Sequence, residues 1–206
     1  MTALAAQPQA SLRLGVDLGG TKTEAVVLDA DGAERWRHRI ATPKQTAESI
    51  CDAIAGLVAD AEAAVAGRCS VGIGTPGSLS PHSGLLRGSN TVVLNGKPVR
   101  QMLEQRLGRE VRIANDANCF ALSEAVDGAG RGAKTVFGAI LGTGVGAGVV
   151  IDGKVLEGLH GIGGEWGHNP LPWPSGEELP GPKCWCGKRG CIETFLSGPG
   201  LARDHL

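Results

Sequence analysis

The stretch Val111-Arg112-Ile113-Ala114-Asn115-Asp116-Ala117-Asn118 decides the fold. A short β-branched run that ends in Asn-Asp predicts a strand that leads into a cleft, and residues 119–126 predict the helix that leaves it. A carboxylate at a strand end, facing a helix N-terminus, is where α/β proteins usually carry their chemistry. Asn and Asp are also favoured helix caps, so the alternative is that Asn115 and Asp116 only begin that helix.

Glycine-rich turns lie on both sides of this stretch, and glycine makes up 33 of the 206 residues, roughly twice its average share. Upstream, the turn at residues 18–23 joins two predicted strands, 12–17 and 24–29. Downstream, residues 142–148 form a second such turn between predicted strands 135–141 and 149–151. Each turn could hold a phosphate through its backbone amides. Considered by itself, the first turn could equally be an ordinary hairpin turn.

Between these turns the pattern predicts a third strand over 34–40 and an amphipathic helix over 47–66. A buried strand over 70–74 ends in Thr75-Pro76-Gly77, and a short helix over 98–107 precedes the deciding stretch. Residues 72–77 spell G-x-G-x-x-G, but Pro76 and the residues after it do not open a helix, which argues against a dinucleotide site. We therefore interpret Thr75-Pro76-Gly77 as a substrate loop, with Ser89-Asn90 in a second polar loop.

Three cysteines are bunched near the end of the chain, and a histidine precedes them. His168, Cys184, Cys186 and Cys191 supply a Cys3His set for a structural, tetrahedral zinc ion. The alternative is a group of unpaired surface cysteines. The other three, Cys51, Cys69 and Cys119, lie singly in apolar or helical surroundings and are predicted to be buried thiols.

Composition excludes several classes of protein. The net charge is −1 and no basic run occurs, so nucleic acid and anionic membrane are not expected as partners. No apolar stretch approaches the roughly 20 residues that span a bilayer. Residues 1–11 lack the features of a signal peptide and are predicted to be a disordered tail of a cytoplasmic protein.

Six motifs, taken together and in order, resemble the ROK sugar kinases (repressor, open reading frame, kinase). The resemblance covers residue 12 to the C-terminus. The motifs are Asp17-Leu-Gly-Gly-Thr-Lys22, Gly72-Ile-Gly-Thr-Pro-Gly77, Asn115-Asp-Ala-Asn118, Leu141-Gly-Thr-Gly-Val-Gly146, Gly164-Glu-Trp-Gly-His168 and Cys184-x-Cys-Gly-x-x-Gly-Cys-Ile-Glu193. The runs 124–128 and 165–173 look most like bacterial ROK fructokinases, with N-acetylglucosamine kinases next.

The resemblance implies an actin/hexokinase-like (ribonuclease H-like) α/β fold of two domains. The N-terminal domain would cover residues 12–117, and residues 118–206 would begin the C-terminal domain. Family members are longer than 206 residues, so the resemblance also implies a C-terminally truncated chain whose second domain is incomplete and lacks the adenosine-binding residues. The full-length protein is expected to be a homodimer.

The resemblance also implies a set of site residues. Asp116 would be the catalytic base that takes the proton from a sugar hydroxyl as it attacks the γ-phosphate of ATP, and Mg²⁺ would lie near Asp17. The sugar-binding positions are Gly74, Thr75, Asn90, Asn115, Asp116, Glu165, His168 and Glu193. The ATP-binding positions are Asp17, Gly19, Gly20, Thr21, Lys22, Gly142, Thr143 and Gly144. The zinc ligands are His168, Cys184, Cys186 and Cys191.

The expected activity is ATP-dependent phosphorylation of a hexose, with D-fructose to fructose 6-phosphate as the first choice. Alternatives within the family are N-acetylglucosamine, mannose or glucose as substrate, or a non-catalytic sugar sensor or inactive fragment. Sensors of the repressor type carry an N-terminal helix-turn-helix, whereas only 11 residues precede the first predicted strand here. A zinc hydrolase is disfavoured because a Cys3His set leaves no coordination position for water.

Overall fold

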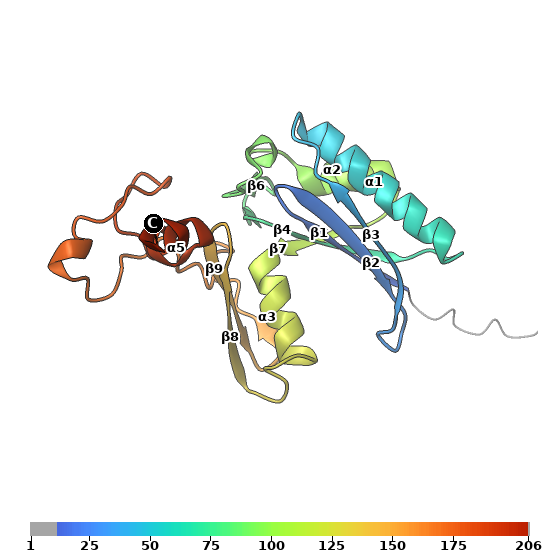
Figure 1. Cartoon of the computed structure of the whole chain (residues 1–206). Helices are drawn as coiled ribbons and strands as arrows, with labels where there is room; N and C mark the ends of the chain where they lie inside the picture. The colour runs from blue at the N-terminus through green and yellow to red at the C-terminus, as the bar shows by residue number, and fades with distance from the viewer. Residues whose placement is uncertain (1–11, 206) are drawn as a thin grey trace, which may run out of the picture. The chain divides into compact units, whose positions relative to one another are not determined.

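The computed structural model describes residues 12–205, so the predicted tail at residues 1–11 lies outside the described residues. The chain divides into two compact units, with the division between Asp116 and Ala117. Each unit has its own sheet (Figure 1). Within residues 12–205, no helix is long and apolar enough to cross a membrane.

The first unit is built on a five-stranded mixed sheet in the order β3-β2-β1-β4-β7. Strands β1, β2 and β3 are antiparallel neighbours, whereas β4 and β7 continue the sheet parallel to β1. The bounds are Arg13–Leu18 for β1, Lys22–Leu28 for β2, Glu34–Ala41 for β3, Ser70–Thr75 for β4 and Arg112–Asn115 for β7. The parallel strands end at the same edge, which is where ligands bind in open α/β sheets.

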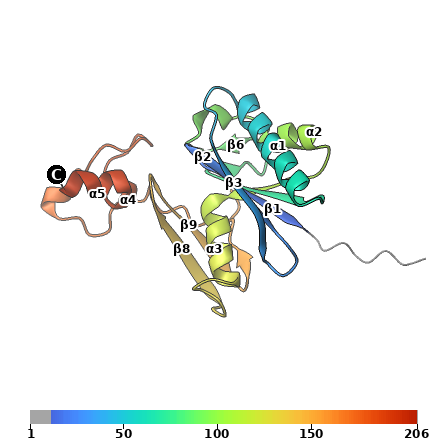
Figure 2. The same ribbon diagram turned by 45° about the vertical axis from the view of Figure 1, so that its right-hand side comes forward.

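Two helices, α1 (Ala47–Ala64) and α2 (Val99–Leu107), cover one face of this sheet (Figures 1 and 2). Thr46 caps α1 through a capping box with Ser49, which fixes where the helix begins. The buried residues of α1 recur at helical spacing and pack with the inward side chains of the sheet. This core includes Leu14, Val16, Val27, Ile50, Ile54, Leu57, Val58, Val71 and Ile73.

Strand β1 alternates between the two faces of the sheet, because successive side chains on a strand point in opposite directions. Leu14, Val16 and Leu18 are buried beneath the helices, whereas Asp17 lies on the opposite face. The predicted strand therefore delivers its carboxylate to the open face. The connection from β4 to α2 contains a small hairpin and a 3-10 turn: β5 (Ser78–Leu79), β6 (Leu86–Arg87) and η1 (Val92–Leu94).

The second unit combines helix α3 (Asp116–Val126) with a three-stranded antiparallel sheet in the order β10-β9-β8. The strands are β8 (Thr135–Leu141), β9 (Val145–Ile151) and β10 (Lys154–Val155). Helix α3 lies beside β8 and β9 in both views (Figures 1 and 2). It begins at Asp116, three residues earlier than expected, so Asp116 is the first helical residue directly after β7.

The second glycine-rich turn is shorter than the sequence predicted. Strand β9 begins at Val145, so Gly146 and Gly148 belong to the strand and not to the turn. A Cβ atom at Gly148 would lie 2.5 Å from the backbone oxygen of Ala117 and 2.7 Å from the Cβ of Ala121. Gly148 therefore allows close packing of α3 on the sheet, and the turn is confined to residues 142–144.

The described part of the chain ends in a broken helical segment. Two helices form, α4 (Ile192–Leu196) and α5 (Gly198–His205), preceded in the long loop by the 3-10 turn η2 (Gly176–Glu178). The break falls at Ser197, which has extended backbone angles. Its hydroxyl accepts a hydrogen bond of 3.1 Å from the amide of Gly200, so Ser197 caps the second helix.

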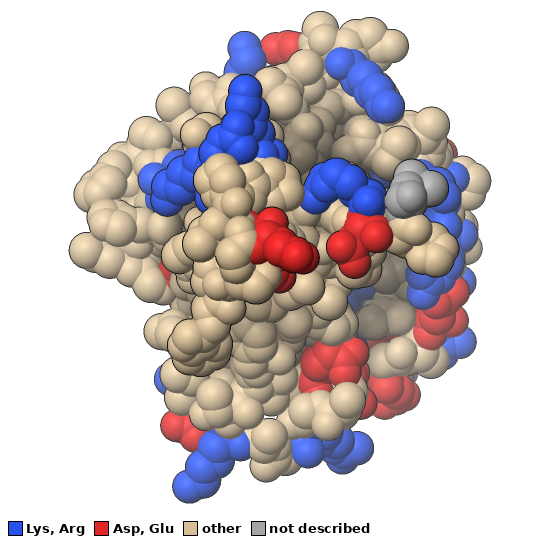
Figure 3. Space-filling model, turned by 60° about the vertical axis from the view of Figure 1, so that its left-hand side comes forward, with Lys and Arg blue, Asp and Glu red and all other residues tan. Residues whose placement is uncertain are grey.

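The isolated cysteines divide differently from the prediction. Cys51 and Cys69 are buried, as expected, but Cys119 is exposed. Ala117 and Ala121, one helical turn apart, face the sheet, which turns Cys119 to the other side of α3. On the face shown in Figure 3, basic and acidic side chains are interspersed.

Candidate functional site

Residues at the carboxyl edge of the first sheet are brought together by strand register. Asp17 on β1 pairs with Gly74 on β4, and Thr75 pairs with Asn115 on β7. Asp116 follows Asn115 directly and is close enough to Asp17 to influence its ionisation. One edge of the sheet therefore carries four of the predicted site residues, Asp17, Gly74, Thr75 and Asn115. The proposed base, Asp116, lies beside them.

Asp17 carries an unfavourable charge in this position. Burial raises the pKa of its carboxyl above the ordinary value of 3.8, and the nearby carboxylates of Asp116 and Glu24 raise it further. Arg39 opposes this shift. Two carboxylates in a partly desolvated position repel each other, and a divalent cation between or beside them would relieve that repulsion. The pair therefore fits a hard, oxygen-preferring cation such as Mg²⁺.

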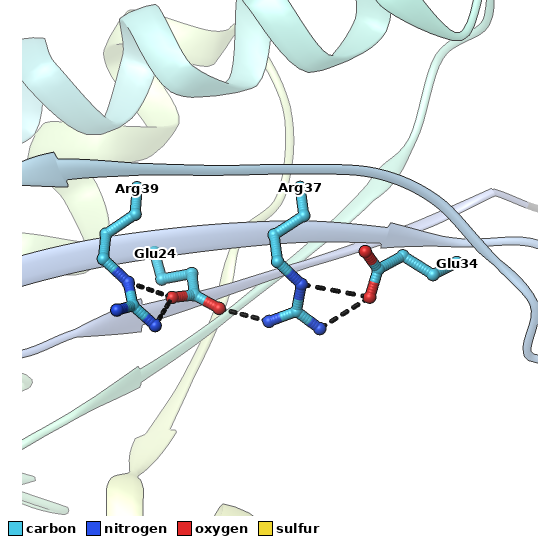
Figure 4. A network of polar contacts seen from close by, with 4 residues as sticks. All are labelled: Glu24, Glu34, Arg37 and Arg39. Atoms are coloured by element: carbon cyan, nitrogen blue, oxygen red, sulfur yellow. Dashed lines mark hydrogen bonds and ion pairs between the residues drawn. The ribbon is translucent and has the colours of Figure 1, made fainter.

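Glu24 is directly opposite Asp17 on β2, and its own charge is compensated by arginines on β3. One carboxylate oxygen contacts Arg37 and the other contacts Arg39, while Glu34 pairs with the far side of Arg37 (Figure 4). Hydrogen bonding to Arg37 is the largest cause that lowers the pKa of Glu24. This network was not predicted from the sequence, although Arg35, Arg37 and Arg39 alternate along the strand and so share one face of it.

The predicted substrate loop after β4 is fastened to Asn115, the residue before the proposed base. The side-chain amide of Asn115 donates a hydrogen bond of 3.0 Å to the carbonyl oxygen of Gly77. Gly77 has a φ of +82°, and a Cβ there would lie 2.3 Å from the backbone oxygen of Arg87. Only glycine fits this bend, which returns the chain into the β5–β6 hairpin.

The first glycine turn contacts the second polar loop. A Cβ atom at Gly20 would have the side-chain oxygens of Asn90 and Thr91 as its nearest neighbours, each 3.6 Å away. The structure thus brings together a predicted phosphate turn and a predicted sugar-binding residue. The amide of Gly19 donates to the oxygen of Lys22 and closes the turn, so this particular amide is used within the protein.

The second glycine turn is held in the same way. The amide of Gly142 donates to the oxygen of Gly144, and the oxygen of Gly142 accepts from the amide of Gly198 at the start of α5. The amide of Val145 donates 2.9 Å to a carboxylate oxygen of Glu193 on α4. Of the predicted ATP-binding residues in this turn, Thr143 and Gly144 keep backbone amides that these bonds do not use.

Glu165 and His168 lie in a loop that packs closely on β9. A Cβ at Gly164 would lie 2.5 Å from the oxygen of Ala147, and one at Gly167 would lie 2.1 Å from the oxygen of Val145. The amide of Glu193 donates to the oxygen of Gly167, which joins this loop to α4. Glu165 is exposed, whereas His168 and Glu193 are half-buried.

The four predicted zinc ligands form one cluster. The potential ligand atoms of His168, Cys184, Cys186 and Cys191 all lie within 4.8 Å of one another. Cys184 Sγ is 3.5 Å from His168 Nδ1, and Cys186 Sγ is 3.6 Å from Cys191 Sγ. Tetrahedral zinc, with bonds of about 2.3 Å to sulfur and 2.0 Å to nitrogen, separates its ligand atoms by about 3.5–3.8 Å. The cluster therefore fits zinc through the Nδ1 atom of His168.

The thiols of the cluster differ in their environment. Burial is the first cause that raises the pKa of the Cys191 thiol to about 12. The pKa of Cys186 is lowered, first by a backbone hydrogen bond from Lys188. Metal coordination would shift the equilibrium of both toward the thiolate. The chemistry of this donor set is structural, because four protein ligands complete a tetrahedral shell.

A family model matches residues 13–206 of this chain, and its description is the ROK family. The chain belongs to the ROK family. The resemblance to the ROK family is thus confirmed.

These relatives within the ROK family are named for N-acetyl-D-glucosamine, whereas the expected sugar was D-fructose. An N-acetyl-D-glucosamine kinase of Pectobacterium atrosepticum is 46% identical over 198 residues, which are 93% of this chain and 65% of that protein. An N-acetyl-D-glucosamine kinase of Escherichia coli O127:H6 is 44% identical over 192 residues, which are 91% of this chain and 63% of that protein. The chain thus spans slightly less than two thirds of these relatives.

Solved structures of ROK proteins share the fold. The ROK hexokinase from Thermus thermophilus matches with a TM-score of 0.80 and 37% identity, over 94% of this chain and 63% of that one. A ROK family glucokinase from Streptomyces griseus, in complex with glucose and AMPPNP, matches with a TM-score of 0.79 and 36% identity, over 94% and 59%. The actin/hexokinase-like α/β fold is therefore confirmed.

Proposed function

We propose that the protein that carries this chain transfers the γ-phosphoryl group of ATP to a hexose. The observation that carries the proposal is the pair Asp17 and Asp116 at the carboxyl edge of the first sheet, beside a glycine turn that contacts Asn90. Phosphoryl transfer requires mainly positioning and compensation of charge, and this edge offers groups for both.

In this proposal Asp116 accepts the proton of the attacking hydroxyl. A sugar hydroxyl is a weak nucleophile, and a positioned base contributes typically about 10²–10⁴-fold to the rate. Asn115 would orient the sugar on the base, since its side chain also fixes the loop Thr75-Pro76-Gly77. Gly74, Thr75 and Asn90 would supply further contacts to hydroxyl groups.

The charge of ATP would be met by the two glycine turns. Gly20, Thr21 and Lys22 offer amides, a hydroxyl and an ammonium group in the first turn, and Thr143 and Gly144 offer amides in the second. The closing amides of Gly19 and Gly142 shape these turns without facing a phosphate. Mg²⁺ would be held at Asp17 and would neutralise phosphate charge.

We assign the remaining sugar contacts to Glu165, His168 and Glu193 of the second unit. Bound zinc would supply no reactive step and would act as a structural cross-link of the loop that holds these residues. With Nδ1 of His168 directed at the Cys184 sulfur, Nε2 would be the ring atom that contacts a sugar hydroxyl.

Two sugars have specific support. The runs 124–128 and 165–173 favour D-fructose, with phosphorylation at O6, as in ROK fructokinases. The names of the relatives, at 44–46% identity, favour N-acetyl-D-glucosamine. A sugar sensor is the competing class, and the presence of Asp116 at its expected position favours the kinase.

The test is ATP turnover by the purified 206-residue chain with Mg²⁺, offered fructose, N-acetyl-D-glucosamine, glucose and mannose in turn. We expect ADP release that depends on one of the sugars, and the ratio of kcat/KM values identifies it. If this chain, and a longer form that spans the full length of its relatives, both bind a sugar without ADP release, the sensor replaces the kinase.

A further inference from the structure

Trp185 lies between two of the clustered cysteines and is exposed over 74% of its surface, yet its side chain makes a specific contact. Its indole Nε1–H donates a hydrogen bond of 2.7 Å to Oε1 of Glu193. An N–H···carboxylate bond of this length is charge-assisted and stronger than a neutral one. Trp185 therefore fixes one oxygen of a half-buried carboxylate.

The other oxygen of Glu193 is engaged with the glycine turn. Oε2 accepts the amide of Val145 at 2.9 Å, and it lies 2.7 Å from where a Cβ atom of Gly144 would be. A side chain at residue 144 would thus displace the carboxylate. Glu193 therefore sits between Trp185 on one side and the end of the turn at residues 142–144 on the other.

Trp185 is also linked to the metal cluster. Its ring meets the ring of His168 edge to face, with centroids 4.8 Å apart and an interplanar angle of 83°. Cys184 and Cys186, its chain neighbours, are both members of the cluster. An ion held by His168, Cys184 and Cys186 would fix the indole in three ways: through its edge-to-face contact with His168 and through the backbone before and after it.

We propose that Trp185 is a positioning residue that couples the cysteine–histidine cluster to the turn at residues 142–144 through the Glu193 carboxylate. Ordering of the cysteine loop by a metal ion holds the indole, the indole holds the carboxylate, and the carboxylate holds the Val145 amide. This inference rests on the proposed zinc site and not on the identity of the sugar.

The first test uses the unaltered chain and NMR hydrogen exchange, with zinc bound and after chelation. The probes are the Trp185 indole N–H and the Val145 amide, and the reference is the Leu156 amide, which bonds to Val149 at the far end of β9. Loss of one charge-assisted hydrogen bond predicts exchange about tenfold faster at both probes, with the reference unchanged. Equal exchange at Val145 with and without bound zinc would overturn the coupling.

The second test separates Trp185 from the metal. Trp185→Phe keeps the aromatic contact to His168 and all four ligands but removes the indole donor, so zinc content should stay at one per chain while Val145 exchange rises. Trp173→Phe is the matched control, since Trp173 is 96% exposed in the same long loop. If Trp185→Phe does not fold, Glu193→Gln weakens the same bonds from the acceptor side and should speed exchange at both probes.

The outcomes distinguish this inference from the proposed metal site. A chain that binds no zinc overturns both. A chain that binds zinc but shows the same Val145 exchange in the unaltered and Trp185→Phe forms retains the metal site and overturns the role of Trp185.

Discussion

The side-chain amide of Asn115 holds the carbonyl oxygen of Gly77 at 3.0 Å, which fastens the end of β7 to the loop after β4. The same residue precedes Asp116, so the loop and the proposed base are linked through one side chain. A substrate bound by that loop would therefore be held in register with the base.

Asn115→Ala should test this link. Removal of the donor is expected to lower the free energy of unfolding by about 0.5–1.5 kcal/mol, the net contribution of one hydrogen bond. Because the loop loses its tie, the sugar KM should rise more than kcat falls. Gln101→Ala, at an exposed position on α2, is the control. An unchanged KM for every sugar would remove Asn115 from the substrate site.

Asp116→Asn should reduce kcat in the active protein by about 10²–10⁴-fold, because the base is lost while the shape is kept. Thermal unfolding should be nearly unchanged, which distinguishes lost chemistry from a lost fold. Asp60→Asn, on an exposed turn of α1, provides a matched control. Turnover near the parental rate would show that another group takes the proton.

Asp17→Asn should stabilise the chain at neutral pH. Burial and the neighbouring carboxylates raise the pKa of Asp17 above 3.8 in the folded state, so the folded state binds a proton more tightly than the unfolded state does. The resulting penalty is absent below the unfolded pKa, grows as pH rises through the folded pKa, and is fully present above it.

Melting curves of both forms, taken without Mg²⁺ from pH 3 to pH 8, check this sign. The advantage of Asp17→Asn should increase with pH and then level off. A mutant that is less stable at pH 7, or an advantage independent of pH, would show that the Asp17 carboxylate is favourably paired.

Removal of zinc should lower stability and loosen sugar binding. A ligand at 100 times its Kd contributes about 2.7 kcal/mol, and each kcal/mol corresponds to about 2–4 °C in a chain of this size. Chelation or Cys186→Ser should therefore lower Tm by several degrees, whereas exposed Cys119→Ser should not. Metal content is measured in parallel, and unchanged Tm and sugar affinity after confirmed metal loss would count against a structural ion.

The sequence predicted those parts of the fold whose signals are local. The alternation over residues 12–17 and the helical spacing over 47–66 predict a strand and a helix. The structure has β1 at Arg13–Leu18 and α1 at Ala47–Ala64, which end one residue later and two residues earlier than predicted. The strand register places Asp17 and Asn115 at one edge, and this parallel pairing was not predicted from the residue pattern. The cysteine spacing indicated the cluster that the structure brings together.

Contacts between distant segments could not be predicted in this way. The bond from Trp185 to Glu193 depends on how a long loop closes, and the Glu24–Arg39 pair depends on strand register. The break at Ser197 did have a local signal in Gly198-Pro199-Gly200. A proline disfavours helical geometry at the residue before it, so helices usually end at or before that residue.

Gly148 also makes a contact that local sequence could not predict, because it packs against a helix that begins 32 residues earlier in the chain. Gly148→Ala should lower the free energy of unfolding by about 1–3 kcal/mol, since the added Cβ would lie 2.5 Å from the oxygen of Ala117 and force α3 away from β9. Gly72→Ala is the matched control: Gly72 is also in a strand, but a Cβ there meets nothing within 4 Å. That change should be neutral or stabilising by about 0.4–1 kcal/mol, because alanine restricts the unfolded chain. Denaturant unfolding of the two variants measures the difference, and equal effects would show that the close approach of Gly148 to α3 does not limit the packing.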